Sequence, residues 1–392
     1  MTEPVGPARR PDVTSAQIGT ESIVYDPATG VAHRLNSTAV LVWDCCDGGT
    51  PIDVIIAELA DALGESPDAI GPSVRAVIRR FGDHGLLAGA PPPAARPAAR
   101  PAASDHPPVA TAEPAPAPGG RSRLLGPYRA LGTTVVVTCC DHDGVADHLE
   151  RMLGPLATTT GPSAPDPVAF TVWKDDRWHV DIDGQRRHTA ADASAVADTV
   201  MFDINWLAFR QPSNYLVVHA AAVARDGVAV VMPALAGAGK STLTAALVAA
   251  GFDYLTDEAA AIDLDTGTVI GYPKPITLDP GSQHLLPGLE PSRPSGRSSK
   301  WHVVPDDVRS GSAVERARIG HLVFPTHVPG ADNRLVPIDT IDATVALVSH
   351  ASDLAVVGHR LAELAAFVDR CTRHTLLHDG IEAPVAAIGS LR

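Results

Sequence analysis

Residues 216–258 read LVVHAAAVARDGVAVVMPALAGAGKSTLTAALVAAGFDYLTDE, and this stretch decides the fold of the larger part of the chain. Two apolar runs, 216–224 and 228–232, predict strands. A glycine-rich turn follows, and the residues after Lys240 predict a helix. Because strand and helix alternate on both sides of this turn, the region belongs to the α/β class.

The turn itself, PALAGAGKST at 233–242, predicts a phosphate-binding loop. It follows the pattern of Gly, four residues and Gly-Lys-Ser/Thr between a strand and a helix at every position but the first Gly. Backbone N–H groups and the helix N-terminus then point at the phosphates. The sequence therefore predicts nucleotide contacts from Ala236, Gly237, Ala238, Gly239, Lys240, Ser241 and Thr242.

Two residues of the loop carry defined roles in this pattern. We expect Lys240 to neutralise the β- and γ-phosphate oxygens and Ser241 to hold Mg²⁺. The chain has 27 Arg and only four Lys, so a retained Lys at this position favours phosphate binding. Ala234 departs from the pattern, because it stands where the first Gly belongs, and predicts a slightly altered loop.

Polar residues on either side of the loop complete the candidate site. His219 lies within the apolar strand that leads to it, and Asp257 and Glu258 end the strand that follows its helix. Carboxylates at strand ends near such loops bind Mg²⁺ or act on the acceptor. Structural roles stay open at this point: His219 could be a hydrogen-bonded core histidine, and Asp257 could cap a strand end.

This block, with YPKPITL at 272–278, SKW at 299–301 and IGHLVFP at 319–325, resembles the HPr kinase/phosphorylase family over most of 121–392. The resemblance implies a P-loop catalytic domain of the HPr-kinase-like and PEP-carboxykinase-like fold, with ATP and Mg²⁺ as cofactors.

Position by position, the resemblance gives Asp257 the role of general base on an acceptor hydroxyl. It implies that His219 orients this base and that Glu258 assists Ser241 at the metal. Lys274 and Lys300 would clamp phosphates or the acceptor peptide, although a solvated surface position is the alternative for both.

A smaller unit precedes this domain. Residues 22–25 and 31–35 predict a hairpin, and helices are expected to begin after Asn36, Thr50 and Ser66. A hairpin with three short helices indicates a winged-helix α+β domain. Residues 1–88 carry 6 Arg, no Lys and 12 acids, a net charge of −6, which argues against DNA binding.

Residues 24–55, VYDPATGVAHRLNSTAVLVWDCCDGGTPIDVI, resemble the PqqD family of precursor-peptide recognition modules. The resemblance implies that a leader peptide adds as a strand to the edge of the 22–35 hairpin and packs on the third helix, 67–81. A purely structural accessory domain is the alternative.

The composition divides the chain and limits its partners. Residues 91–118 contain 10 Pro and 10 Ala, which predicts a linker. We expect a disordered segment at 1–16, the PqqD-like domain at 17–88, a linker at 89–120 and the kinase-like domain at 121–392, the last divided into 121–212 and 213–392.

The net charge of −14 argues against nucleic acid as a partner, and no apolar run reaches the roughly 18–20 residues of a membrane span. The N-terminus lacks a secretory h-region, and the five Cys show no zinc-site spacing. We expect a soluble cytoplasmic protein. A homo-oligomer is left open.

Together these features predict an ATP-dependent kinase that phosphorylates a Ser or Thr of a ribosomally made precursor peptide. Two alternatives remain: a non-catalytic, nucleotide-gated recognition scaffold for a partner enzyme, and a small-molecule kinase on the same fold.

Overall fold

The computed structural model describes residues 6–90, 120–159, 166–190, 192–210, 215–235, 237–286, 289, 301–352 and 354–392. They form two compact units, one from the described residues of 1–99 and 338–370, the other from those of 100–337 and 371–392. Residues 338–370 thus group with the N-terminal part, whereas the sequence had assigned them to the catalytic core. The expected linker, 89–120, lies almost entirely outside the described residues.

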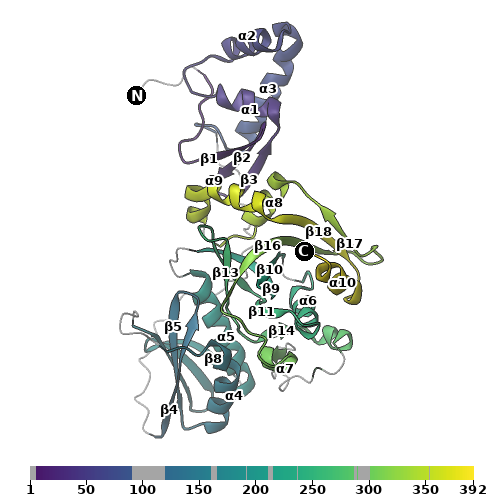
Figure 1. Ribbon diagram of the computed structural model, residues 1–392. Coiled ribbons are helices and arrows are strands. Elements are labelled where there is room, and N and C mark those ends of the chain that lie inside the picture. Colours follow the sequence, from purple (N-terminus) through teal and green to yellow (C-terminus); the bar gives the residue numbers. More distant parts are fainter. Residues whose placement is uncertain are drawn as a thin grey trace. The chain divides into compact units, whose positions relative to one another are not determined.

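The first unit contains a three-stranded antiparallel sheet, with strands β1 (Thr14–Ile18), β2 (Glu21–Asp26) and β3 (Val31–Leu35) in that order (Figure 1). The expected hairpin is therefore confirmed and extended by one strand. The expectation of disorder across 1–16 is wrong for residues 6–16, because Arg10 forms ion pairs with Asp12 and the buried Asp26.

Three helices follow as expected: α1 (Ser37–Asp44), α2 (Ile52–Leu63) and α3 (Pro67–Asp83). The side chains of Asn36 and Ser66 cap α1 and α3, which satisfies N–H groups that have no partner within the helix. Val24 of β2 packs with these helices in one apolar core, together with Val42, Trp43, Ile55, Val74 and Phe81.

Helices α8 (Thr340–Val348) and α9 (Leu354–Arg370) also contact this sheet (Figure 1). Strand β2 is consequently buried along both faces, although side chains alternate across a strand. Val24 faces α1–α3, whereas the Tyr25 ring lies against Gly358 of α9. The sheet is thus the middle layer of this unit.

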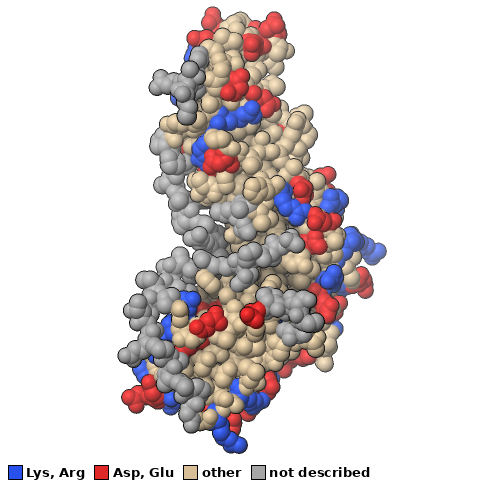
Figure 2. Space-filling model, turned by 90° about the vertical axis from the view of Figure 1, so that its left-hand side faces the viewer, with Lys and Arg blue, Asp and Glu red and all other residues tan. Residues whose placement is uncertain are grey.

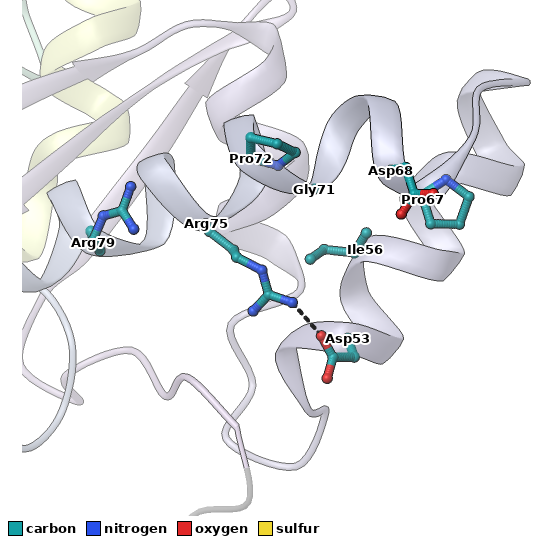
Figure 3. A pocket seen from close by; sticks show the side chains of 8 residues that line it. All are labelled: Asp53, Ile56, Pro67, Asp68, Gly71, Pro72, Arg75 and Arg79. Carbon is teal, nitrogen blue, oxygen red and sulfur yellow. Dashed lines mark hydrogen bonds and ion pairs between the residues drawn. The ribbon is translucent and has the colours of Figure 1, made fainter.

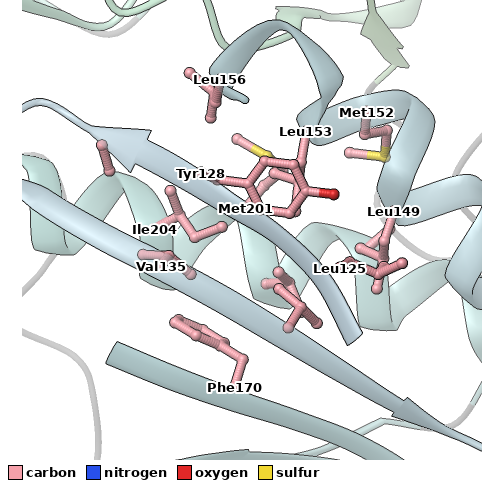
Figure 4. Packing of buried hydrophobic residues seen from close by; sticks show 14 of the residues in the cluster. Leu125, Tyr128, Val135, Leu149, Met152, Leu153, Leu156, Phe170, Met201 and Ile204 are labelled. Carbon is pink, nitrogen blue, oxygen red and sulfur yellow. The ribbon is translucent and has the colours of Figure 1, made fainter. Parts of the chain in front are cut away.

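The second unit begins with a five-stranded sheet in chain order β4-β5-β6-β7-β8. Its strands are β4 (Ser122–Ala130), β5 (Thr133–Cys140), β6 (Val168–Lys174), β7 (Trp178–Ile182) and β8 (Gln185–Ala190). Helices α4 (Asp143–Leu153) and α5 (Ala193–Arg210) cover it, with the short η1 (Gly154–Leu156) between β5 and β6. Figure 4 shows the core between these layers, where Tyr128, Leu149, Phe170 and Ile204 pack together. The sequence had not indicated β4 or β8.

The larger sheet has the order β10-β9-β12-β13-β16-β18-β17, with β11 beside β9. An additional parallel pairing between β10 and β16 closes five of the strands into a ring. The strands are β9 (Leu216–Arg225), β10 (Val228–Pro233), β11 (Asp253–Thr256), β12 (Ala259–Asp263), β13 (Thr268–Ile270), β16 (Arg316–His327), β17 (Arg334–Pro337) and β18 (Thr372–His378).

The elements around this sheet are α6 (Lys240–Ala249), the pair β14 (Ile276–Leu278) and β15 (Trp301–Val303), η2 (Pro280–Leu285), α7 (Pro305–Val308) and α10 (Glu382–Gly389). Helix α6 packs on β9 and shares an apolar core with the sheet. The whole is a mixed α/β structure, as the sequence indicated.

Surface charge agrees with the composition. On the face drawn in Figure 2, acidic and basic side chains of the described residues are interspersed and do not form one large basic patch. No helix in the part of the chain that the structure describes is both long and apolar enough to cross a bilayer.

Candidate functional site

The glycine-rich loop joins β10 to α6. Gly237 and Gly239 have φ of +85° and +78°, in the left-handed region that glycine adopts without strain. Gly239 is the N-cap of α6, so the unpaired N–H groups of the first helical turn lie at the end of the loop. Both glycines are exposed. Ala236 lies outside the described residues.

Ala234 explains how the loop tolerates the loss of its first glycine. Its side chain is buried, with 4% exposure, and its φ is not positive. Because the backbone does not need the freedom of glycine here, a methyl group fits at this position.

The Lys240 ammonium group lies inside the loop. Its Nζ is 2.6 Å from the carbonyl oxygen of Ala234, 2.9 Å from that of Leu235 and 3.1 Å from Nε2 of His219. Burial lowers the pKa of Lys240, while the charges of Glu258 and Asp257 act in the opposite direction. The loop therefore holds a buried cation close to both acids.

Both carboxylate oxygens of Asp257 accept hydrogen bonds. Its Oδ1 accepts hydrogen bonds from Nζ of Lys274 at 2.6 Å and from the Tyr254 hydroxyl at 3.0 Å. Its Oδ2 accepts one from the backbone N–H of Thr277 at 3.2 Å, and the Ser241 side chain lies near enough to the carboxylate to stabilise its charged form. Burial by itself would raise the pKa of Asp257, but Lys274 and these hydrogen bonds bring the pKa below its ordinary value of 3.8.

The two adjacent acids face different groups because the strand is irregular where they lie. The pairing of β11 with β9 shifts register between Tyr254 and Thr256, and such irregularities re-aim side chains near sites. The Thr256 hydroxyl then accepts hydrogen bonds from the N–H groups of Glu258 and Ala259. Asp257 turns into the protein, whereas Glu258 stays 27% exposed.

His219 lies between the second acid and the loop. Its Nδ1 is 3.4 Å from Oε1 of Glu258, and its Nε2 is the nitrogen near Lys240. The side chain is 10% exposed and comes from β9, opposite Ala259. The structure thus brings His219, Lys240, Ser241 and both acids into one place.

The remaining predicted residues fall into two groups. Thr242 is buried, and its hydroxyl shares a hydrogen bond with Ser282 at 2.8 Å. Lys274 is fully buried on Asp257, so the solvated alternative does not describe it. Lys300 lies outside the described residues.

The sequence had not singled out Tyr254 or Thr277. A tyrosine in an apolar strand is most simply explained as core, and its hydroxyl gives no separate signal. Thr277 acts through its backbone N–H, which no residue pattern identifies.

A divalent ion fits the residues present. No group of three or more His, Cys, Asp or Glu side chains that could hold a metal occurs among the described residues. Mg²⁺ does not require one, because it binds one or two carboxylates together with phosphates and water. The Ser241 hydroxyl and the neighbouring Asp257 carboxylate are residues that would contribute to such a site.

The first unit offers two surfaces of a different kind. A shallow pocket of about 570 Å³ lies between α2 and α3, where Arg75 forms an ion pair with Asp53 (Figure 3). The second surface is a strand edge: β2 is paired on both sides, whereas β3 pairs only with β2 among the described residues. Of the two hairpin strands, only β3 therefore offers backbone groups to an added strand.

Comparison with protein families identifies part of the chain. Residues 21–87 match the family described as Coenzyme PQQ synthesis protein D (PqqD). These residues are a PqqD domain. The match spans β2, β3 and helices α1–α3, so β1 and helices α8–α9 lie outside it.

Two solved structures were also found to be similar to parts of the chain. "TbiB1 in Complex with the TbiA(beta) Leader Peptide" is 20% identical, with a TM-score of 0.20, over 21% of this chain and 95% of that one. "Structure of the Hpr(Ser) kinase/phosphatase from Coxiella burnetii" is 15% identical, with a TM-score of 0.23, over 43% of this chain and 89% of that one. No curated protein matches the sequence.

Proposed function

We propose that this chain is an ATP-dependent kinase that phosphorylates a Ser or Thr of a ribosomally made precursor peptide, whose leader binds the PqqD domain. The observation that carries the proposal is the buried Lys240 ammonium inside the loop, 3.1 Å from Nε2 of His219, whose Nδ1 lies 3.4 Å from Oε1 of Glu258.

The nucleotide end of the proposal rests on the loop. Its exposed glycines give close approach to the backbone, and the start of α6 presents unpaired N–H groups. Lys240 would contact the terminal phosphates, and Ser241 with Glu258 would hold Mg²⁺. ATP with Mg²⁺, when bound, supplies the phosphoryl group for transfer.

The proposed activation of the acceptor hydroxyl depends on Asp257 and Glu258. A Ser or Thr hydroxyl must lose its proton as it attacks, and a positioned carboxylate contributes about 10²–10⁴-fold. In this proposal Asp257 takes the proton once the acceptor hydroxyl replaces the Ser241 side chain beside its carboxylate, which Lys274 and Tyr254 hold in place. His219 orients the second acid, Glu258, through its Nδ1.

The proposed leader binding depends on the PqqD domain and on the edge of its sheet. The edge of β3 fits a leader that adds as an antiparallel strand and reaches α3, with backbone hydrogen bonds for affinity and side-chain pockets for selection. Binding the leader on the same chain raises the effective concentration of the acceptor residue at the kinase site.

The decisive experiment incubates the full chain with γ-labelled ATP, Mg²⁺ and the short leader-plus-core peptide encoded beside its gene. Mass spectrometry of the peptide should find one added phosphate on a core Ser or Thr. A core peptide without its leader should react more slowly at the same concentration.

Two other results would contradict the proposal. ATP binding without labelled peptide would favour the scaffold. Equal reaction with and without the leader, or transfer only to small hydroxyl compounds, would favour a small-molecule kinase.

A further inference from the structure

A histidine that belongs to none of the groups above lies against the phosphate-binding loop. His378 is the last residue of β18 and pairs in register with His327 of β16. Its side chain is buried, with 4% exposure, although the loop glycines beside it are exposed. The rings of His378 and His327 are 5.6 Å apart, and Nε2 of His327 is 3.5 Å from Oδ1 of Asp379.

The ring of His378 meets the loop at its last two residues before α6. A Cβ placed on Gly239 would lie 3.6 Å from Cε1 of His378. The ring also interacts with the Ala238 backbone, and its Nδ1 lies 3.4 Å from the carbonyl oxygen of Gly380. Among the described residues, its Nε2 has no hydrogen-bond partner of regular geometry. Burial lowers the pKa of His378, which favours the neutral ring, and an N–H on its Nδ1 faces the Gly380 carbonyl oxygen.

The loop is contacted from two sides, by Lys240 from within and by the ring of His378 from outside. On its inner side the loop is held by Lys240, which donates to the carbonyl oxygens of Ala234 and Leu235. A phosphate competes for that ammonium group, because Lys has only three N–H donors. The ring of His378 acts on the turn without using the ammonium, so this support remains when Lys240 contacts phosphate.

We propose that His378 is a positioning residue for nucleotide binding, which holds the Ala238–Gly239 turn so that the amides before α6 converge on the phosphates. The inference rests on the proposed nucleotide site and adds to it a residue from the last strand of the sheet. His378 acts through the loop and does not touch the reacting atoms.

The test measures the affinity of the full-length protein for Mg²⁺ADP by calorimetry, together with KM for ATP and kcat. His378→Phe keeps an aromatic ring beside Gly239 and removes both ring nitrogens, and we expect the Kd for ADP and the KM for ATP to rise about tenfold. At saturating ATP, kcat should change less than about threefold, because chemistry is untouched. His378→Gln retains a donor and should restore most of the affinity.

A matched control and a folding control complete the experiment. His374 lies on the same strand and the same face, four residues earlier, so His374→Gln should bind ADP as the wild type does. Melting temperatures show whether each variant is folded. If His378→Phe is unfolded, the Kd of His378→Gln for ADP is compared with the wild-type value instead. Wild-type Kd for ADP in His378→Phe, or a fall in kcat with KM unchanged, would overturn the inference. If the wild-type chain binds no ADP, the proposed function itself fails.

Discussion

Nζ of Lys274 lies 2.6 Å from Oδ1 of Asp257, and neither side chain has any exposure. The attraction between two opposite buried charges offsets the free energy of removing them from water. A single buried charge has no such offset. Lys274 also donates to the carbonyl oxygen of Pro275, and Tyr254 bridges its backbone to Asp257. The pair therefore fixes the first acid of the site.

Lys274→Met should destabilise the protein strongly, because it leaves the Asp257 carboxylate buried without its cation. Breaking a buried pair from one side costs about 3–5 kcal/mol. Urea denaturation of the second unit measures this change.

The control for this prediction is Lys174→Met, which removes an exposed lysine whose ammonium lies 5.6 Å from the centre of the Trp178 ring and should change the free energy of unfolding by less than about 1 kcal/mol. The double variant Lys274→Met/Asp257→Asn should recover part of the loss. Equal stability of Lys274→Met and the wild type would show that the pair is not formed in solution.

Asp257→Asn should lower phosphoryl transfer at least about 100-fold while nucleotide still binds, since a general base contributes about 10²–10⁴-fold. The amide keeps the shape of the carboxylate but leaves Lys274 buried without its counter-ion, so the rate is compared at a temperature well below the melting temperature of the variant. Steady-state transfer rates and ADP calorimetry separate the two effects.

Glu258→Gln is the informative companion to this variant, because Glu258 is the more exposed acid and lies beside His219. We expect it to raise the Mg²⁺ concentration needed for half-maximal transfer. Normal transfer by Asp257→Asn together with loss of transfer in Glu258→Gln would reverse the roles of the two acids.

The stability of the second unit should fall as the pH is lowered from 7 to 5. Burial lowers the pKa of His321, His374 and His378 below the ordinary value of 6.5. Nearby charges add smaller contributions: His374 and Arg318 at His321, Arg373 at His374, and His327 at His378. A depressed histidine pKa means that the unfolded chain binds protons first, so stability is present above pH 6.5 and is lost as the pH falls toward the folded-state values.

The midpoint of urea unfolding, measured at several pH values, checks this prediction. His321→Gln should weaken the dependence of the unfolding midpoint on pH, because it removes one titrating group. The glutamine amide keeps a polar group for Thr372, whose hydroxyl lies 2.7 Å from Nδ1 of His321. A midpoint that rises on acidification between pH 7 and 5 would contradict the assigned direction.

Removing residues 1–99 alone should make the remaining chain aggregate, because α8 and α9 lose the sheet that they contact. A matched deletion is available: Pro337 of β17 faces His374 of β18 in antiparallel register, so a short turn can join these strands in place of 338–371.

Analytical ultracentrifugation and melting temperatures compare the two deletions. The variant that lacks both segments should be monodisperse, whereas the variant that keeps α8–α9 should associate through an exposed apolar face. Equal behaviour of the two would show that these helices do not depend on the PqqD domain. The comparison also matters for activity, since a simple deletion would confuse loss of the leader site with loss of folding.

The sequence by itself determined the local elements of this protein. Hairpin residues, helix caps at Asn36 and Ser66, and the strand, loop and helix around Lys240 depend on contiguous residues, whose turn chemistry and periodicity are written in the chain. The PqqD domain was likewise visible in its hydrophobic spacing, because that pattern is local.

Tertiary structure alone decided which distant groups meet. Apolar residues recur at helical spacing in 339–370, but nothing in that spacing identifies the sheet that α8 and α9 contact. Likewise, the ion pair of Lys274 with Asp257 and the approach of His378 to Gly239 join residues of separate segments. Sheet pairing brings such segments together through backbone hydrogen bonds that every residue can make, so the side chains do not reveal the partners in advance.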